Sequence, residues 1–130
     1  MYKINDKEYE CSVAVTIDVF NDKWKLLIIW HLLDGEKRFK EIDEIFHNVS
    51  QKTLTVKLKE LEQKNLITRE VFPEVPPKVV YSLTPAGERL RPMLKNMYHW
   101  GISYVQEHGE ITECDHCCEA QIAKKIGACD

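Results

Sequence analysis

The sequence predicts a mainly α-helical fold that carries one small β-hairpin. Two observations support this fold class. Apolar residues recur at helical spacing over residues 12–64 and again over residues 85–108, and between these segments the pattern changes to that of strands. At 130 residues, the chain fits one compact domain with an added helix or tail.

Four helices are expected before the strands. We place them at Ser12–Phe20, Trp24–Leu33, Arg38–Phe46 and Ser50–Lys64. Ser12 and Ser50 are suitable N-caps, because a serine hydroxyl can accept a hydrogen bond from a backbone N–H of the first turn. A break at His47-Asn48-Val49 separates the last two helices, since asparagine tolerates a left-handed backbone. Asn65 then ends the fourth helix.

The strands are expected at Leu66–Phe72 and Val79–Leu83. Three prolines in residues 73–78 exclude a regular two-residue turn and indicate a stiff, projecting loop. Thr84 followed by Pro85 is a typical helix start, and we expect one continuous helix from there to about His108. Its apolar stripe comprises Leu90, Leu94, Met97, Gly101, Tyr104 and Val105. This order of elements is that of a winged helix-turn-helix.

Composition excludes several functional classes. The net charge is −3, from 18 basic and 21 acidic residues, which argues against a uniformly basic coat for nonspecific binding. The first ten residues carry charges of both signs and lack the apolar core of a signal peptide. The most apolar run, Leu26–Leu33, is too short to span a bilayer. We therefore expect a soluble, cytoplasmic protein without a membrane partner.

The helix predicted from Ser50 has the composition of a DNA-recognition helix. Leu54, Leu58 and Leu61 share one face, which we expect to be buried. The opposite side is cationic and hydrogen-bonding, and it comprises Lys52, Val56, Lys59 and Gln63, with Thr55 and Thr53 on its flanks. Carboxylates come only near the far end, whereas recognition helices insert their N-terminal part into the major groove.

Individual side chains of this helix suggest contacts with double-stranded DNA. Lys52 can donate to guanine or phosphate, Gln51 can pair with adenine, and Thr55 can contact either base. Val56, a branched aliphatic residue among polar neighbours, suits contact with a thymine methyl group. As the cap, Ser50 leaves free backbone N–H groups directed toward a phosphate.

Two positions outside this helix complete the expected interface. Lys78, expected at the tip of the loop, would reach an adjacent groove or the phosphate backbone, and Arg38 would contact a phosphate. A solvated helix with ordinary lysines is the simpler interpretation, but its place before a Pro-Pro-Lys loop favours DNA binding. The alternative function is a protein-interaction winged helix, which would predict an apolar or acidic face where Lys52, Thr55 and Lys59 stand.

Several segments spaced over residues 11–101 form a specific pattern. They are Cys11-Ser12-Val13, Lys23–Ile28, Arg38–Ile42, Val49–Thr55, Leu58–Glu62, Phe72–Gly87 and Trp100-Gly101. The wing segment Phe72–Gly87 is the most specific of them. Together they resemble the HxlR-type transcriptional regulators. The resemblance implies a homodimer whose N-terminal and C-terminal helices form the interface, with the two recognition helices in successive major grooves.

For this chain, the resemblance implies an interface from residues 13–20 and from the stripe Leu90–Val105, and hence a palindromic operator. The length of that stripe gives independent support, because the small remaining core cannot cover it. We expect a regulator and not an enzyme, and no cofactor. No catalytic dyad is apparent, since His31, His47 and His99 lie within or beside predicted helices.

Cys11 stands where several redox-sensing members of that family carry a reactive cysteine. Sensing requires a thiolate, which is favoured at a partly exposed site near a helix start, and Cys11 precedes the first predicted helix. Glu8 and Glu10 oppose thiolate formation, so an inert thiol is the alternative.

The segment 110–130 is a cysteine-rich tail that departs from the pattern. Its cysteines are Cys114, Cys117, Cys118 and Cys129, at a spacing that is not a standard zinc site. Metal binding, thiol chemistry and cysteines without a role stay open there, and no metal ligand is assigned. A thiol oxidoreductase is disfavoured, because its CxxC motif normally follows a strand. We divide the chain into an arm (1–10), a winged helix-turn-helix domain (11–109) and this tail.

Overall fold

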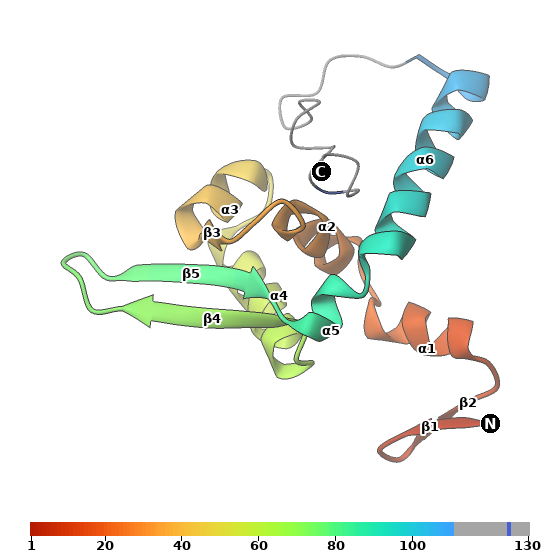
Figure 1. The fold of residues 1–130 in the computed structure, drawn as a ribbon, viewed down its shortest axis with the longest axis horizontal. Coiled ribbons are helices and arrows are strands. Elements are labelled where there is room, and N and C mark those ends of the chain that lie inside the picture. The colour runs from red at the N-terminus through yellow and green to blue at the C-terminus, as the bar shows by residue number, and fades with distance from the viewer. Residues whose placement is uncertain (111–124, 126–130) are drawn as a thin grey trace.

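The computed structural model describes residues 1–110 and Lys125 (Figure 1). Its helices are α1 (Ser12–Val19), α2 (Lys23–Leu32), α3 (Phe39–Ile45), α4 (Gln51–Gln63), α5 (Pro85–Glu88) and α6 (Arg91–His108). Its strands are β1 (Tyr2–Ile4), β2 (Lys7–Tyr9), β3 (Lys37–Arg38), β4 (Ile67–Phe72) and β5 (Lys78–Leu83). The predicted winged helix-turn-helix is confirmed, with α3 and α4 as the helix pair and β4 and β5 as the wing. No helix in the described residues combines the length and apolarity needed to cross a membrane.

The apolar core lies between α2, α3, α4 and the larger sheet. Leu54, Leu58 and Leu61 of α4 are at most 1% exposed, so the predicted buried stripe is confirmed. They belong to one cluster with Ile28 and Ile29 of α2. Because full burial of each such side chain stabilises the fold by about 1.5–3 kcal/mol, the stripe fixes which side of α4 faces solvent.

The larger sheet is antiparallel, with strand order β3-β5-β4. β4 and β5 pair along their whole length. The sequence did not predict β3, in which Lys37 and Arg38 pair with Tyr81 and Val80 of β5. Two residues are too few to produce the alternating pattern that signals a strand. β3 joins the start of α3 to the wing.

The N-terminal arm contains a second hairpin, β1 and β2, that sequence patterning also missed. Its turn uses Asn5, whose φ of 54° is a left-handed conformation that asparagine tolerates. Asp18 of α1 accepts hydrogen bonds from the Lys7 ammonium, at 3.0 Å, and from the Tyr9 hydroxyl. The hydrogen bonds from Tyr9 and Lys7 hold the pKa of Asp18 below its usual value. These contacts attach the hairpin to α1.

Three predicted helix caps can be compared with the structure. Ser50 and Thr84 are confirmed as N-caps of α4 and α5, because each side-chain oxygen accepts a hydrogen bond from a backbone N–H three residues later. The prediction for Ser12 is wrong. Cys11 occupies the N-cap position of α1, and Ser12 is the first helical residue.

The predicted left-handed asparagine between α3 and α4 is also wrong. Within residues 1–110, positive φ angles occur at Asn5, Gly35 and Asn65, and not in the 47–49 break. That break is closed instead by a hydrogen bond from the Val49 N–H to the Phe46 carbonyl, at 3.0 Å. Asn65, with a φ of 60°, follows α4 as expected.

The single final helix predicted from Pro85 is wrong, because Arg89 and Leu90 separate α5 from α6. Pro92 explains the break, since it has no backbone N–H and its ring would clash with the Glu88 carbonyl in a continuous helix. After the break, α6 projects away from the core helices and the wing (Figure 1). Leu94 is its one buried residue within the described chain.

Gly87 allows α5 to pack closely against the turn that follows α4. A Cβ atom at Gly87 would lie 2.2 Å from the Leu66 carbonyl oxygen. We expect Gly87→Ala to lower the free energy of unfolding by about 1–3 kcal/mol, measured by urea denaturation, because the backbone must shift to admit the methyl group. The control is Gly109→Ala, whose Cβ would lie 3.7 Å from its nearest neighbour. Equal stability of the two variants would contradict the close approach.

Candidate nucleic-acid interface

One side of α4 is open to solvent and carries most of the predicted contact residues. We call it the recognition face, and it comprises Gln51, Lys52, Thr55, Val56 and Lys59, all exposed. Val56 is 45% exposed although it is aliphatic. Within the described residues, Lys52 and Lys59 form no ion pair. Their ammonium groups are therefore available to an anionic or hydrogen-bonding partner.

The first turn of α4 is held by its own side chains. The Ser50 hydroxyl oxygen accepts from the Thr53 N–H at 3.1 Å, and the Ser50 hydroxyl donates to the Thr53 hydroxyl oxygen at 2.9 Å. Gln51 donates from Nε2 to the Asp43 carboxylate at 3.0 Å, and the Thr55 hydroxyl donates to the Gln51 carbonyl at 2.7 Å. Ser50 and Thr53 thus fix the start of the helix, whereas Gln51 can exchange a surface partner.

A groove of about 490 Å³ lies between the start of α3, α4 and the wing. Basic side chains line it, namely Arg38, Lys40, Arg69 and Lys78, together with Thr55 of the recognition face. A hollow of about 270 Å³ shares Thr55 and Arg69 with this groove. The structure therefore brings Arg38 and Lys78 to the same groove as the recognition face.

Sequence reasoning missed Lys40 and Arg69. Arg69 lies on β4, opposite Tyr81 of β5. Strand periodicity places Arg69 on the same side of β4 as Ile67, which is buried in the core cluster with the leucines of α4. That alternation was available in the sequence and could have identified Arg69. Lys40 lies in the first turn of α3, next to the predicted Arg38.

The position predicted for Lys78 needs correction. Lys78 is the first residue of β5 and not the tip of the wing loop. Its ammonium group lies 5.1 Å from the centre of the Phe72 ring, and its side chain is partly buried. The loop between the strands instead exposes Val75 completely. The loop with the three prolines lies between β4 and Lys78, and the Lys78 side chain lines the groove.

The side of α4 next to α2 carries ion pairs. Lys25 of α2 is 2% exposed, and its ammonium lies 2.5 Å from the Glu60 carboxylate. This hydrogen bond lowers the pKa of Glu60. Lys57 lies 2.8 Å from the carboxylate of Asp22, and hydrogen bonding to that carboxylate raises the pKa of Lys57. The charges of Lys57 and Glu60 are thus engaged within the protomer, unlike those of Lys52 and Lys59.

Cys11 is exposed at the N-cap of α1. The Cys11 side chain makes no hydrogen bond to the first turn of α1. In the described part of the chain, no group of three His, Cys, Asp or Glu residues is placed to hold a metal ion. The four cysteines of the tail lie outside the described residues, so the alternatives for them stay open.

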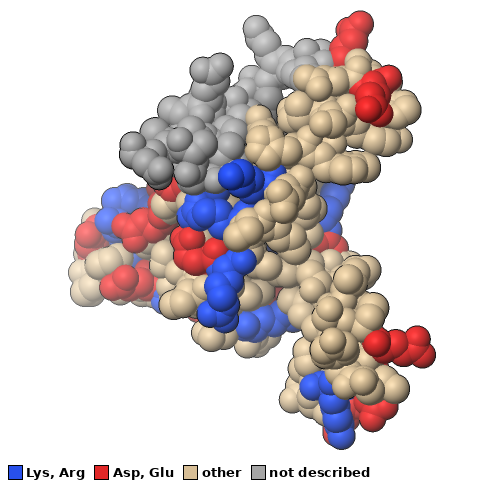
Figure 2. All heavy atoms as spheres, turned by 45° about the vertical axis from the view of Figure 1, so that its right-hand side comes forward, with Lys and Arg blue, Asp and Glu red and all other residues tan. Residues whose placement is uncertain are grey.

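Apolar side chains are exposed along α1 and α6. Val13 and Ile17 of α1 are 65% and 66% exposed, and Trp100 of α6 is 68% exposed. Met97 and Tyr104 of α6 are also exposed. In Figure 2, uncharged residues cover most of the projecting α6, with acidic residues at its far end, whereas the part that carries the N-terminal hairpin and α1 also has charges of both signs. Apolar surface of this extent normally marks an interaction site.

The central part of the chain matches a known family. A model of the HxlR-like helix-turn-helix family matches residues 19–109. The chain belongs to this family. The resemblance inferred from the spaced segments is therefore confirmed, and so is the prediction of a DNA-binding transcriptional regulator. The family consists of transcriptional regulators.

Proteins similar to this HxlR-like chain include transcriptional regulators found by sequence and others with solved structures. YdeP, an uncharacterized HTH-type transcriptional regulator of Bacillus subtilis, is 45% identical over 94 residues, which cover 72% of this chain and 73% of YdeP. The redox regulator HypR in its reduced form is 43% identical, with a TM-score of 0.70, and the match covers 75% and 98% of the two chains. Reduced YodB from B. subtilis is 39% identical, with a TM-score of 0.65 and coverage of 76% and 98%. YodB has also been solved after diamide treatment and with bound quinone.

Lys52 and Arg69 should affect DNA binding in different ways. We expect Lys52→Ala to weaken binding to the selected site by about 1–3 kcal/mol and to relax the preference at one base position. Arg69→Ala should weaken binding to all sequences and reduce the slope of log K against log salt by about 1, as expected of a phosphate contact.

Fluorescence anisotropy over a salt series measures both effects. Arg89→Ala is the matched control, because Arg89 is exposed between α5 and α6, away from the groove, and its loss should change neither quantity. An unchanged affinity of Lys52→Ala would remove that residue from the recognition face.

Proposed function

We propose that this HxlR-like transcriptional regulator acts as a homodimer that binds a palindromic operator in double-stranded DNA. The observation that carries the proposal is the exposure of Val13, Ile17 and Trp100 on two helices that leave the core. A second copy related by two-fold symmetry would cover these side chains, because an isologous interface pairs the same surface of each protomer. Such a dimer presents two α4 helices, and its symmetry requires a palindromic site.

Within each half-site, the recognition face supplies the base contacts. Lys52 and Gln51 donate to base edges in the major groove, and Val56 contacts a thymine methyl group. Ser50 and Thr53 hold the first turn, and Thr55 and Lys59 extend the same face.

The basic groove provides the phosphate contacts, from Arg38, Lys40, Arg69 and Lys78. Binding to DNA is consistent with a cytoplasmic location of the protein. The division into an arm, a central domain and a tail, at the boundaries predicted above, belongs to the same proposal.

Cys11 is the proposed site of redox regulation. Its exposed thiol precedes α1, one of the two helices of the proposed dimer interface. Oxidation of this thiol would therefore alter the surface through which two protomers meet. The solved states of HypR and YodB support this proposal, because those relatives exist in oxidised, diamide-treated or quinone-bound forms.

The dimer proposal predicts a monomer when charge is placed on the apolar surface. We expect Trp100→Glu and Ile17→Glu each to yield a monomer at micromolar concentration, because an unpaired carboxylate is costly to bury. Light scattering after size-exclusion chromatography measures the mass. Lys95→Glu places the same side chain at an exposed α6 position whose residue is already charged, and should leave the dimer intact. A wild-type monomer under these conditions would refute the proposal.

The redox proposal predicts that Cys11→Ser abolishes the response to oxidants. Wild-type protein should lose operator binding after treatment with diamide, which oxidises thiols to a disulfide, and should regain it with a thiol reductant, which cleaves that disulfide. Binding lost after treatment with a quinone should not return, because the quinone forms a thioether with the thiol. A gel-shift titration measures the change. A variant with serine at all four tail cysteines is the control and should respond like the wild type. A normal response of Cys11→Ser would assign sensing elsewhere.

A further inference from the structure

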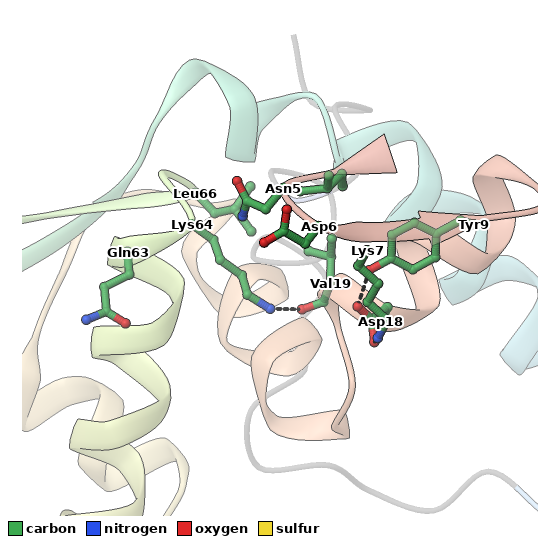
Figure 3. Close-up of a pocket in the computed structure, with 10 residues that line it drawn as sticks. Asn5, Asp6, Lys7, Tyr9, Asp18, Val19, Gln63, Lys64 and Leu66 are labelled. Carbon is green, nitrogen blue, oxygen red and sulfur yellow. Dashed lines mark hydrogen bonds and ion pairs between the residues drawn. The ribbon is translucent and has the colours of Figure 1, made fainter. Parts of the chain in front are cut away.

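The core does not hold α1, because this helix has no buried residue. Polar contacts hold its C-terminal end instead. The Lys64 ammonium, just after α4, donates to the Val19 carbonyl at 2.7 Å (Figure 3). Although Lys64 is an exposed residue, partial desolvation of its ammonium group lowers its pKa, and the Val19 carbonyl accepts a hydrogen bond from this group. The hydrogen bond between Lys64 and Val19 therefore links the last turn of α1 to the end of α4.

Two further links join α4 to the turn between α1 and α2. Lys57 pairs with Asp22 at 2.8 Å, and Asp22 also accepts from the Lys25 N–H as the N-cap of α2. Burial raises the cost of the Asp22 charge, but the hydrogen bonds from Lys57 and Lys25 outweigh it and lower the pKa of Asp22. The ammonium of Lys25 bridges Glu60 of α4, at 2.5 Å, and Asn21 of the turn, at 3.1 Å.

The three residues of α4 and its C-cap that make these links are Lys57, Glu60 and Lys64. Their spacing of three and four residues places them on one side of the helix, beside the leucine stripe. Burial of the leucines sets how closely α4 packs against the core, but the hydrophobic effect is non-directional and does not by itself fix the rotation of the helix. Hydrogen bonds and ion pairs have defined partners and lengths, so they fix the rotation and axial position of α4 relative to the end of α1 and the start of α2.

The burial of Lys25 supports a geometric role for its ion pair. Its partner Glu60 is partly exposed, and the desolvation of the Lys25 ammonium offsets much of the attraction between the two charges, so the pair adds little net stability. A cleft of about 880 Å³ opens between the N-terminal hairpin, the end of α1 and the residues that follow α4. Figure 3 shows Lys64 directed toward Val19 at this cleft, where side chains do not fill the space.

We propose that the contacts Lys64–Val19, Lys57–Asp22 and Glu60–Lys25 couple the position of α1 to the orientation of α4. In the dimer, this coupling sets the distance between the two recognition helices and hence the half-site spacing that the protein selects. The inference rests on the proposed function, because it requires a dimer on a palindromic site. Lys57, Glu60 and Lys64 are thus positioning residues, which act on DNA through α4 without touching it.

The test compares operator spacing with base preference. Operators are selected from random DNA with wild-type protein, and variants of the selected operator then carry one base pair more or less between the half-sites. Wild-type protein should lose at least about tenfold in affinity on either change, since avidity is lost when both half-sites cannot be engaged together. Lys57→Met and Lys64→Met should each lose less than about threefold, because α4 can then adjust its position.

Both variants keep the aliphatic stem, and the exposed position of Lys64 makes its replacement compatible with folding. Lys3→Met is the matched control, since it removes an ammonium group from the exposed β1 strand and should retain the wild-type spacing profile. Base preference within each half-site should be unchanged in all three variants.

A wild-type spacing profile in both Lys57→Met and Lys64→Met would overturn this inference alone. An altered base preference would also overturn it, because the residues would then act on the recognition face itself. If wild-type protein selects no paired half-sites at all, the proposed dimeric function fails, and the coupling fails with it.

Discussion

Burial of the leucine stripe on α4 is the constraint on which the other faces of that helix depend. With Leu54, Leu58 and Leu61 directed into the core, the 3.6-residue period assigns every other position to a side. Lys57 and Glu60 then lie next to α2, where carboxylate and ammonium partners meet them. The recognition face is left to solvent. The helical period therefore gives α4 three separate sides, one packed in the core, one paired with α2 and one exposed as the recognition face.

The protomer leaves a second kind of surface unpaired. Pro92 ends α5, and α6 projects away from the core beyond its first turns, so that Met97, Tyr104 and Val105 of its apolar stripe stay exposed. α1 likewise buries none of its residues. These features are costly for an isolated chain, because exposed apolar surface orders water without a compensating gain. The proposed dimer accounts for both helices with one symmetric contact.

Elements with a long, regular pattern were predictable from the sequence. The leucine stripe of α4, the strands of the wing and the Thr84 cap were all predicted, because each depends on residues near in sequence. Short elements such as β3 were not, since two residues carry no period. The ion pair between Lys25 and Glu60 depends on tertiary packing, so no local signal reveals it. Pro92 and Arg69 differ from these, because proline chemistry and strand alternation contained the relevant information.

The two-residue strand β3 has a consequence for how the DNA contacts combine. Its pairing with β5 makes the start of α3 and the wing one hydrogen-bonded unit. Arg38 and Lys78 belong to this unit, so they would contact the DNA together and not independently. Once one of them is bound to a phosphate, the other is at a high effective concentration near the DNA, and its binding costs little further conformational entropy. A local group of four basic side chains can in this way favour DNA binding although the net charge of the chain is −3.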